Sequence, residues 1–360
     1  MRAALDARLT LYDSAGVGRY IRHLASALAG QLGPGEFKVL ADFRDGGWGR
    51  DAIGVIGPAH SGLGDRLLSL QLRAMDLDVL HSPDHVLPPA IPCPSVLTVH
   101  DVSFLALAAD EGGAPDGYYA RCRESLERAE AVICDSEFTK CELLRLTGVE
   151  AAKLKVIDPG LSPHFGPHAA RRSAPVAAKY GLRRPYVLSV GTAGPRKNVG
   201  RLVRAFLQTP HARRTTLALA GRGSIEFLEA MELGSERVDA ASVTALGAPS
   251  QEDMPALIAG AECVALVSLY EGFGMPLLEA MGSGVPCLAS NRRPFTDFAQ
   301  GAAEFVDPSD EADIARGLDR LLSDEGRREM LGAQGLRLAR AFTWERAAAA
   351  TAALYRTVAG

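Results

Sequence analysis

Short apolar segments alternate with longer segments of mixed polarity along most of the 360 residues. The run CVALVSL at 263–269 has the length of a strand and is rich in β-branched residues, as expected of a strand buried in a parallel sheet. In other segments apolar residues recur at helical spacing, as Leu24 and Leu28 do in 18–31. This alternation predicts an α/β fold with doubly wound parallel sheets.

The pattern predicts elements throughout both halves of the chain. In the first half we expect strands at 2–5, 37–41, 53–56, 78–81, 95–99, 131–134 and 155–157, and helices at 18–31, 65–75, 116–129 and 136–147. In the second half we expect strands at 186–190, 215–220, 242–246, 263–267, 286–289 and 304–306, with helices between them and further helices from about 310 onward.

The segment DPGLSPHFGPHAARRSAP at 158–175 is crowded with proline and glycine, which is typical of a linker. A chain of 360 residues is long for one domain. We therefore expect a boundary near Gly166, with an N-terminal domain at 1–166 and a C-terminal domain at 167–342. The last segment, 343–360, is expected to form a helix that crosses back to the N-terminal domain.

Charge and cysteine content exclude several classes of protein. The formal net charge is −4, and residues 1–166 hold 16 Lys/Arg against 22 Asp/Glu, so the positive excess lies in the second half. That half is expected to hold an anionic ligand, and no basic stripe indicates a nucleic-acid surface. The six cysteines lack metal-site spacing and are expected to be reduced.

The amino-terminal sequence and the hydropathy bear on localisation. Charged Asp6 and Arg8 stand where a signal peptide needs an apolar region. No segment approaches the roughly 20 apolar residues of a membrane span. We therefore expect a cytoplasmic protein, with any membrane contact peripheral and at the inner face.

Two glutamates flank a glycine turn in the stretch 268–290, SLYEGFGMPLLEAMGSGVPCLAS. The turn follows a predicted strand, so it lies at the carboxyl end of a sheet, where α/β sheets bind ligands. Gly272 and Gly274 allow a tight turn, and the free N–H groups of the next helix favour phosphate. Glu271 and Glu279 would suit the neutral hydroxyls of a sugar or ribose. The alternative is that Glu271 is solvated and Glu279 is a first-turn residue stabilised by the helix dipole.

Two further constellations lie at predicted strand ends. Arg196 and Lys197, in VGTAGPRKN at 190–198, suit a diphosphate, although such pairs are commonly only solvated. His100, at the end of another strand, is either structural or a site residue. His81, Asp84, His85, His100 and Asp101 together invite a metal hypothesis, which we discount.

EGFGMPLLEAMGSGVPCLAS at 271–290 closely resembles the E-x7-E signature of family 4, the retaining, nucleotide-sugar-dependent glycosyltransferases. VGTAGPRKN resembles the family's phosphate-gripping element, and GVGRY at 16–20 resembles its glycine loop. The resemblance extends from about Asp6 to Val306. It implies the GT-B fold, in which two Rossmann-like α/β domains face each other across a cleft.

The resemblance also assigns roles within that cleft. Arg196 and Lys197 would hold the donor phosphates, Glu279 the ribose and Glu271 the donor sugar, while His100 would lie near the transferred sugar. The implied catalytic residues are His100, Arg196, Lys197 and Glu271, and the implied donor contacts are Gly16, Gly18, Thr192, Arg196, Lys197, Leu246, Gly272, Phe273, Gly274, Met275, Pro276, Leu277 and Glu279.

The implied function is transfer of a hexose from a nucleoside-diphosphate sugar to a glycan or lipid-linked acceptor, with retention and without metal or other cofactor. VGTxxPRKN together with DAR-x-GVGRY resembles members that use GDP-mannose or a deoxyhexose, which favours GDP-mannose as donor. A phosphorylase or epimerase of the same fold stays open as an alternative. So does a non-catalytic subunit that binds sugar nucleotides.

Overall fold

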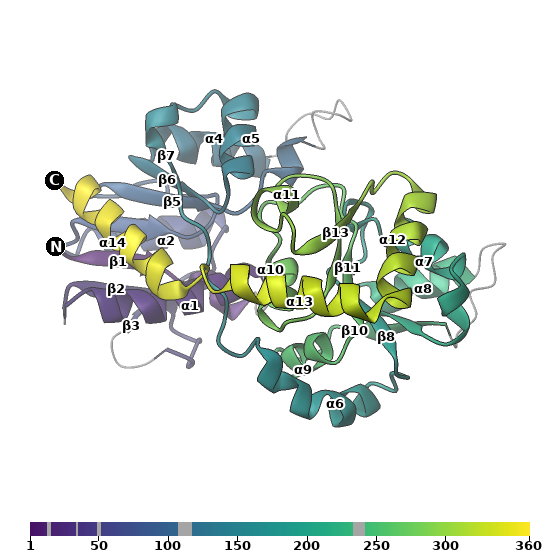
Figure 1. Ribbon diagram of the computed structural model, residues 1–360. Helices are drawn as coiled ribbons and strands as arrows, with labels where there is room; N and C mark the ends of the chain where they lie inside the picture. Colours follow the sequence, from purple (N-terminus) through teal and green to yellow (C-terminus); the bar gives the residue numbers. More distant parts are fainter. Residues whose placement is uncertain (13–15, 34, 49–51, 107–116, 233–241) are drawn as a thin grey trace. The chain divides into compact units, whose positions relative to one another are not determined.

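The computed structural model describes residues 1–360 apart from 13–15, 34, 49–51, 107–116 and 233–241 (Figure 1). The chain divides into two compact units. Unit 1 comprises Met1–Gly160 and Phe342–Gly360, and unit 2 comprises Leu161–Ala341. Each unit is built on its own parallel β-sheet.

Unit 1 contains a seven-stranded sheet in the order β3-β2-β1-β4-β5-β6-β7. Its described strands pair in parallel, for example with Ala3 opposite Phe37 and Leu80 opposite Ser95. The order reverses between β1 and β4, which are neighbours. The strands are β1 (Ala3–Asp6), β2 (Phe37–Asp42), β3 (Ala52–Val55), β4 (Val79–Ser82), β5 (Ser95–Val99), β6 (Ala131–Cys134) and β7 (Leu154–Val156).

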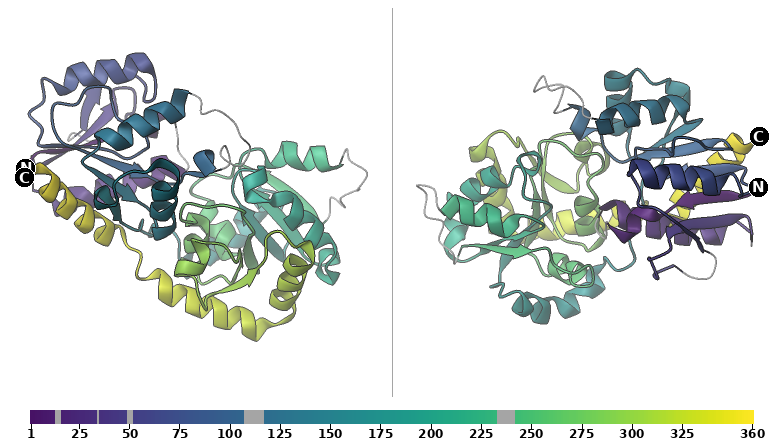
Figure 2. Two further views of the ribbon diagram at one scale, coloured as in Figure 1. Left: turned by 90° about the horizontal axis from the view of Figure 1, so that it is seen from above. Right: turned by 180° about the vertical axis from the view of Figure 1, so that it is seen from behind.

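Helices cover both faces of this sheet (Figure 2). Successive strand residues point to opposite faces, so Ala3 and Leu5 pack with α1 (Gly16–Gln31) and α14 (Trp344–Ala359). Ala4 packs with α2 (Gly62–Leu72) on the other side. Other helices of unit 1 are η1 (Arg8–Leu11), α4 (Gly117–Arg128), α5 (Glu137–Thr147) and η2 (Ala151–Lys153).

Unit 2 contains a six-stranded parallel sheet in the order β10-β9-β8-β11-β12-β13, which reverses between β8 and β11. One core cluster lies between the sheet and the helices α7 and α12. The strands are β8 (Tyr186–Val190), β9 (Thr216–Ala220), β10 (Val243–Gly247), β11 (Cys263–Leu266), β12 (Cys287–Ser290) and β13 (Ala303–Val306). The helices are η3 (Pro167–Arg172), α6 (Ser173–Lys179), η4 (Pro195–Lys197), α7 (Val199–Leu207), η5 (Pro210–Arg213), α8 (Ser224–Glu232), α9 (Met254–Ala259), α10 (Met275–Gly282), α11 (Phe295–Phe298), α12 (Glu311–Ser323) and α13 (Glu325–Ala339).

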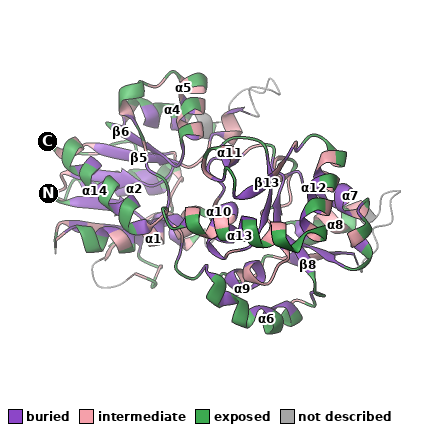
Figure 3. Ribbon diagram, in the orientation of Figure 1, coloured by how far each residue is buried: buried purple, intermediate pink, exposed green. Residues whose placement is uncertain are grey.

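The predicted α/β class is confirmed, and the buried strands lie between helices with exposed outer surfaces (Figure 3). Three predicted strands, 95–99, 131–134 and 186–190, coincide with β5, β6 and β8. The prediction for α2 was wrong at both ends, because this helix covers Gly62–Leu72 instead of 65–75. It begins earlier because Ser61 Oγ accepts a hydrogen bond from the Gly64 N–H and caps the helix.

Candidate functional site

The strand reversal in unit 2 brings two loops together at the carboxyl ends of β8 and β11. The loop after β8 carries Arg196 and Lys197, and the loop after β11 carries Leu269, Tyr270 and Glu271. The Leu269 N–H donates to the Arg196 carbonyl at 2.8 Å, and Arg196 Nη1 donates to the Tyr270 carbonyl at 2.9 Å. In open α/β sheets, ligands bind at such a switch point.

Both cations contact one carboxylate. Lys197 Nζ lies 2.5 Å from Glu271 Oε1, and Arg196 Nη1 lies 3.1 Å from Glu271 Oε2. Burial alone would raise the pKa of Glu271, but the charges of Lys197 and Arg196 outweigh it and lower the pKa. The ionised trio keeps one positive charge in excess, which favours an anionic ligand. Glu271 is 8% exposed, so the alternative of a solvated loop residue is wrong.

The segment 191–198 between β8 and α7, here called the cation loop, is fixed by its backbone. Gly191 has φ +143°, and a Cβ there would approach Lys197 Cε to 3.1 Å. A Cβ on Gly221 would come within 1.9 Å of the Gly191 carbonyl oxygen, so the loops after β8 and β9 need glycine to lie this close. Asn198 follows the cations at φ 59°, and its Nδ2 donates to the carbonyls of Val267 and Pro308 at 3.0 and 2.6 Å. Sequence reasoning missed Asn198.

The glycine turn of 272–274 is supported from the loop after β12. Gly274 has φ +103°, and a Cβ at this position would lie 2.3 Å from Phe295 Cε1. Phe273 stacks on Phe298, with ring centroids 4.9 Å apart and planes 1° from parallel. Phe295 and Phe298 are the two ends of the short helix α11, which therefore packs directly on the turn.

Glu279 lies in α10 and is 3% exposed. Pro276 occupies the first turn of this helix as predicted, but that turn contains no acidic residue. Glu279 is the fifth residue from Met275, so the alternative that it merely stabilises the helix start is wrong. Glu279 is thus a buried residue on the helix that begins at the glycine turn.

The other predicted residues of unit 2 lie at or after the carboxyl ends of strands of the same sheet. Thr192 is exposed in the loop after β8, and Leu246 is buried in β10. Met275, Pro276 and Leu277 form the start of α10. Side-chain contacts join Arg196, Lys197 and Glu271 directly.

In unit 1, His100 is held by two acceptors. Its Nδ1 lies 2.7 Å from Asp135 Oδ2, and its Nε2 lies 3.0 Å from the Pro83 carbonyl oxygen. Both partners accept, so both ring nitrogens donate and the ring is an imidazolium. Burial lowers the pKa of His100, but the Asp135 carboxylate outweighs this and raises it to about 9. Asp135 was not predicted from sequence as a partner of His100.

The neighbouring histidines are also paired. His85 Nδ1 lies 2.6 Å from Asp84, and its Nε2 lies 2.8 Å from the Asp101 carbonyl oxygen. His81 is fully buried between Tyr355 and Thr98, and burial lowers its pKa to about 3. No group of three His, Cys, Asp or Glu side chains suited to a metal ion occurs among the described residues. Gly16 and Gly18 lie at the start of α1, and the preceding residues 13–15 of the motif lie outside the described part.

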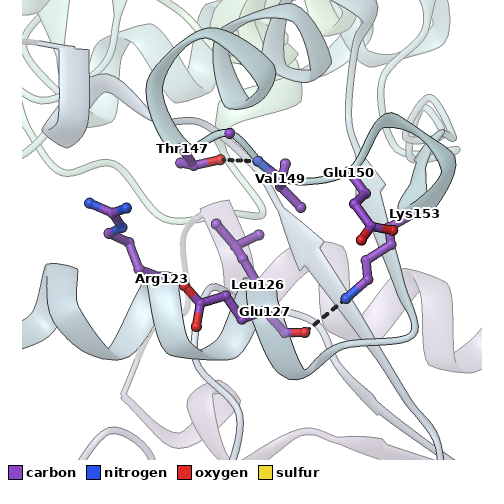
Figure 4. Close-up of a pocket in the computed structure, with 8 residues that line it drawn as sticks. Arg123, Leu126, Glu127, Thr147, Val149, Glu150 and Lys153 are labelled. Carbon is purple, nitrogen blue, oxygen red and sulfur yellow. Dashed lines mark hydrogen bonds between the residues drawn. The ribbon is translucent and has the colours of Figure 1, made fainter.

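Two hollows of unit 1 are separate from these residues. One, of about 220 Å³, lies between α4 and the chain after α5, and Lys153 Nζ donates to the Glu127 carbonyl beside it (Figure 4). The other, of about 460 Å³, lies between α1 and the edge of the sheet. None of the predicted site residues lines either hollow.

The two Rossmann-like parallel-sheet units agree with the GT-B fold, and comparison with known proteins identifies the family. Residues 14–165 match Glycosyltransferase Family 4, and residues 176–337 match Glycosyl transferases group 1. The chain is 30% identical over 282 residues to the O-antigen chain mannosyltransferase B of Escherichia coli. The alignment covers 77% of this chain and 74% of that protein. The chain therefore belongs to the group 1 glycosyltransferases.

Solved structures agree on the fold. Sucrose-phosphate synthase from Thermosynechococcus elongatus superposes with a TM-score of 0.79 at 21% identity, covering 99% of this chain and 98% of that one. Anabaena Alr3699/HepE, in complex with UDP-glucose, superposes with a TM-score of 0.76 at 16% identity, covering 98% of this chain and 100% of that one. Within the described residues, no helix is long and apolar enough to cross a membrane.

Proposed function

We propose that this glycosyltransferase moves a mannosyl residue from GDP-mannose to a hydroxyl of a glycan or lipid-linked acceptor, with retention of configuration. The observation that carries the proposal is the convergence of Arg196, Lys197 and Glu271 at the switch point of unit 2. The name of the Escherichia coli relative supports mannose as the sugar. The UDP-glucose complex of Alr3699/HepE supports a nucleotide sugar as the donor class.

Stabilisation of the leaving group is the main catalytic task of the unit 2 site. As the bond between sugar and phosphate breaks, negative charge builds on the diphosphate, and Arg196 and Lys197 supply donors for that charge. Glu271 holds both cations at the loop and accepts from hydroxyls of the donor sugar. Glu279 accepts from the ribose hydroxyls, and Phe273 and Gly274 shape the sugar pocket.

Retention follows from transfer on the face that the leaving group occupied. The departing phosphate takes the proton of the acceptor hydroxyl, so no protein nucleophile takes part. Glu271 and Glu279 are therefore binding groups and differ from the acid and nucleophile pair of glycoside hydrolases. Arg196 and Lys197 replace a divalent ion, so the reaction needs no metal.

The two units divide the binding work in this proposal. Unit 2 binds the donor through its charged edge, and unit 1 binds the acceptor. Gly16, Gly18 and His100 are the candidate binding residues of unit 1. The protein acts at the cytoplasmic face of a membrane when the acceptor is lipid-linked.

A donor panel tests the proposal. Thermal shift with nucleoside diphosphates and their sugars should give the largest rise in melting temperature with GDP-mannose, because a tighter ligand stabilises the native state more. Transfer to a mannose-containing acceptor, with the product anomer assigned by NMR, should show retention and no loss of rate in EDTA. Binding without transfer or donor hydrolysis would indicate a non-catalytic subunit, and an inverted product would contradict the mechanism.

A further inference from the structure

The segment between β3 and α2 holds a histidine in an unusual backbone conformation. His60 has φ 61°, and in the described part of the chain the one other non-glycine residue with a positive φ is Asn198 of the cation loop. The left-handed region is disfavoured for residues with a side chain, so it persists only where the surrounding structure enforces it. The contacts around His60 should therefore show what it is held in place to do.

Two glycines fold this segment tightly onto the first turn of α2. A Cβ on Gly57, which has φ +109°, would come within 2.5 Å of Gly64 Cα. A Cβ on Gly64 would come within 2.1 Å of the Pro58 carbonyl oxygen. Neither position has room for a side chain, so the segment is close-packed on the helix that follows it.

Two arginines hold the carbonyl groups of the same segment. Arg8 is 2% exposed, and its Nη1 donates to the Gly64 carbonyl at 3.3 Å and to the Gly57 carbonyl at 3.4 Å. Arg121 Nη2 donates to the carbonyl of His60 itself at 3.1 Å. The backbone that carries the histidine is thus fixed by buried and half-buried hydrogen bonds.

The side chain of His60 shares one carboxylate with a second imidazole ring. His60 Nε2 lies 2.7 Å from Asp84 Oδ2, and His85 Nδ1 lies 2.6 Å from Asp84 Oδ1. Burial alone would raise the pKa of Asp84, but His85 and His60 outweigh it and hold the pKa well below its usual range. The His60 side chain is 26% exposed and the His85 side chain 12%, so His60 is the outer ring of the pair.

These contacts join His60 to the switch point of unit 1. The strand order reverses between β1 and β4, and ligands bind at such reversals in open α/β sheets. Arg8 follows β1 and Asp84 follows β4, so the two residues that hold the His60 segment come from the two strands at the reversal. His60 is therefore a partly exposed polar group beside a position where a ligand is expected.

The charged groups that hold the segment are balanced among themselves. Arg8 Nη2 lies 2.8 Å from Asp6 Oδ2 and 3.1 Å from Asp65 Oδ1, and Arg121 Nη1 lies 3.3 Å from Asp65 Oδ2. Asp84 lies between two imidazole rings. Unlike the cations of unit 2, these groups leave no excess of positive charge, so they suit neutral hydroxyls better than phosphate.

We propose that His60 binds a hydroxyl group of a neutral sugar acceptor, with Asp84 as the residue that positions its ring. An imidazole nitrogen can donate to a hydroxyl or accept from it, depending on the tautomer. The inference rests on the proposed function, in which unit 1 binds the acceptor. Because the ring is fixed, it cannot find another partner when the hydroxyl is missing, and His60 would thereby select among acceptors.

Deoxy analogues of a simple acceptor test the role of His60. With GDP-mannose as donor, methyl α-mannoside and its monodeoxy analogues should reveal one hydroxyl whose removal lowers the wild-type kcat/KM roughly 10- to 100-fold. His60→Gly keeps the left-handed backbone and should raise the KM of methyl α-mannoside about tenfold, while that discrimination falls to about threefold or less. The inhibition constant of GDP reports on unit 2 and should not change.

His211 provides a matched control in unit 2. Its Nε2 also lies close to a carboxylate, 3.0 Å from Asp319 Oδ1, but on η5 instead of at the switch point. His211→Ala should therefore leave the discrimination among the deoxy analogues unchanged. Melting temperatures should show that each variant folds. His60→Asn is the second variant, because asparagine also tolerates a positive φ, and it should lose the same discrimination.

Saturation-transfer NMR with the same methyl mannosides and no donor repeats the comparison without turnover. An unreactive wild type whose NMR pattern still depends on His60 would contradict the proposed function alone. The inference is overturned if the wild type does not discriminate among the analogues, or if His60→Gly discriminates as the wild type does. It is also overturned if the affinity for GDP falls by the same factor as that for the acceptor, because His60 would then support the fold or the donor site.

Discussion

The two sheets reverse their strand order at one pair of strands each, yet the charged groups at these two edges are held in opposite ways. In unit 2, two long cationic side chains share the carboxylate of Glu271, with Lys197 15% and Arg196 29% exposed. In unit 1, the ring of His100 donates to two acceptors, and the ring of His85 contacts two more.

This difference indicates which edge can exchange partners. Lysine carries three N–H donors and arginine five, so each can keep a bond to Glu271 while its other donors reach phosphate oxygens. His100 can leave Asp135 only by stranding a buried carboxylate whose Oδ1 has no hydrogen-bond partner among the described residues. We interpret the edge of unit 2 as the ligand-gripping edge, and His100 as a fixed positive charge more than as a proton carrier.

The largest expected effect comes from removing a cation at the exchangeable edge. Lys197→Ala should lower kcat roughly 100- to 1,000-fold, because one donor to the developing charge is lost. Steady-state kinetics with GDP-mannose measure this, with Lys155→Ala on the exposed face of β7 as the control. Near-normal turnover by the Lys197 variant would show that Lys197 does not bind the donor phosphates. The distinction between a ligand-binding edge in unit 2 and a fixed edge in unit 1 would then be lost.

The second prediction concerns the fixed edge and its pH dependence. The folded pKa of His100, about 9, lies above the usual 6.5, so its contribution to stability is complete below about pH 6.5 and is lost as the pH rises through 9. The contribution is at most about 3 kcal/mol. His81 has the opposite shift, to a pKa of about 3, so it changes the stability only at pH values below 6.5. That range does not overlap the range in which His100 titrates.

Asp135→Asn should remove the His100 part of this alkaline loss by withdrawing the charge that raises the His100 pKa, whereas the part due to His85, whose pKa Asp84 raises, should remain. Urea unfolding of the wild type and the variant between pH 6 and pH 10 measures the difference, and an NMR titration of the His100 ring measures the pKa itself. A wild-type stability that stays flat across this interval would show that His100 is neutral, and the assignment of an imidazolium would be wrong.

Local patterns were sufficient to predict most of the fold. Strand-length apolar runs located β5, β6 and β8 to the residue, because buried parallel strands have a distinctive composition. The acidic and basic motifs of the second half were also visible, since Glu271 and Lys197 each lie in a loop after a predicted strand. The GT-B fold and the family followed from those motifs and agree with the comparisons.

Contacts between distant segments could not be predicted in the same way. Asn198 binds carbonyls 69 and 110 residues away, and the His100 ring pairs with a carboxylate 35 residues away. Phe295 fills the space beside Gly274 only because β12 lies next to β11. Such pairings depend on strand order and register, which the spacing within one motif does not encode.

A smaller effect is expected from the buried carboxylate of α10. In the proposed function Glu279 accepts from the ribose hydroxyls, so Glu279→Ala should weaken binding of GDP about tenfold. Calorimetric titration with GDP measures this, and the melting temperature of the ligand-free variant reports whether the fold survives. Glu279→Gln retains one acceptor oxygen, so its affinity for GDP should lie between those of Glu279→Ala and the wild type. Equal binding by all three proteins would remove Glu279 from the donor site.

The smallest expected effect separates the sugar end of the site from the phosphate end. Phe298→Leu loses the stack on Phe273, which is worth about 1 kcal/mol for an aromatic pair, and so loosens the turn that carries Gly274. The cation loop is held separately by Asn198, so the KM for GDP-mannose should rise about fivefold while the inhibition constant of GDP stays unchanged. Phe43→Leu, on a 66% exposed side chain of unit 1, is the control. If GDP affinity fell by the same factor as the sugar nucleotide's, the turn and the cation loop would act as one rigid edge, and unit 2 would resemble the fixed edge of unit 1.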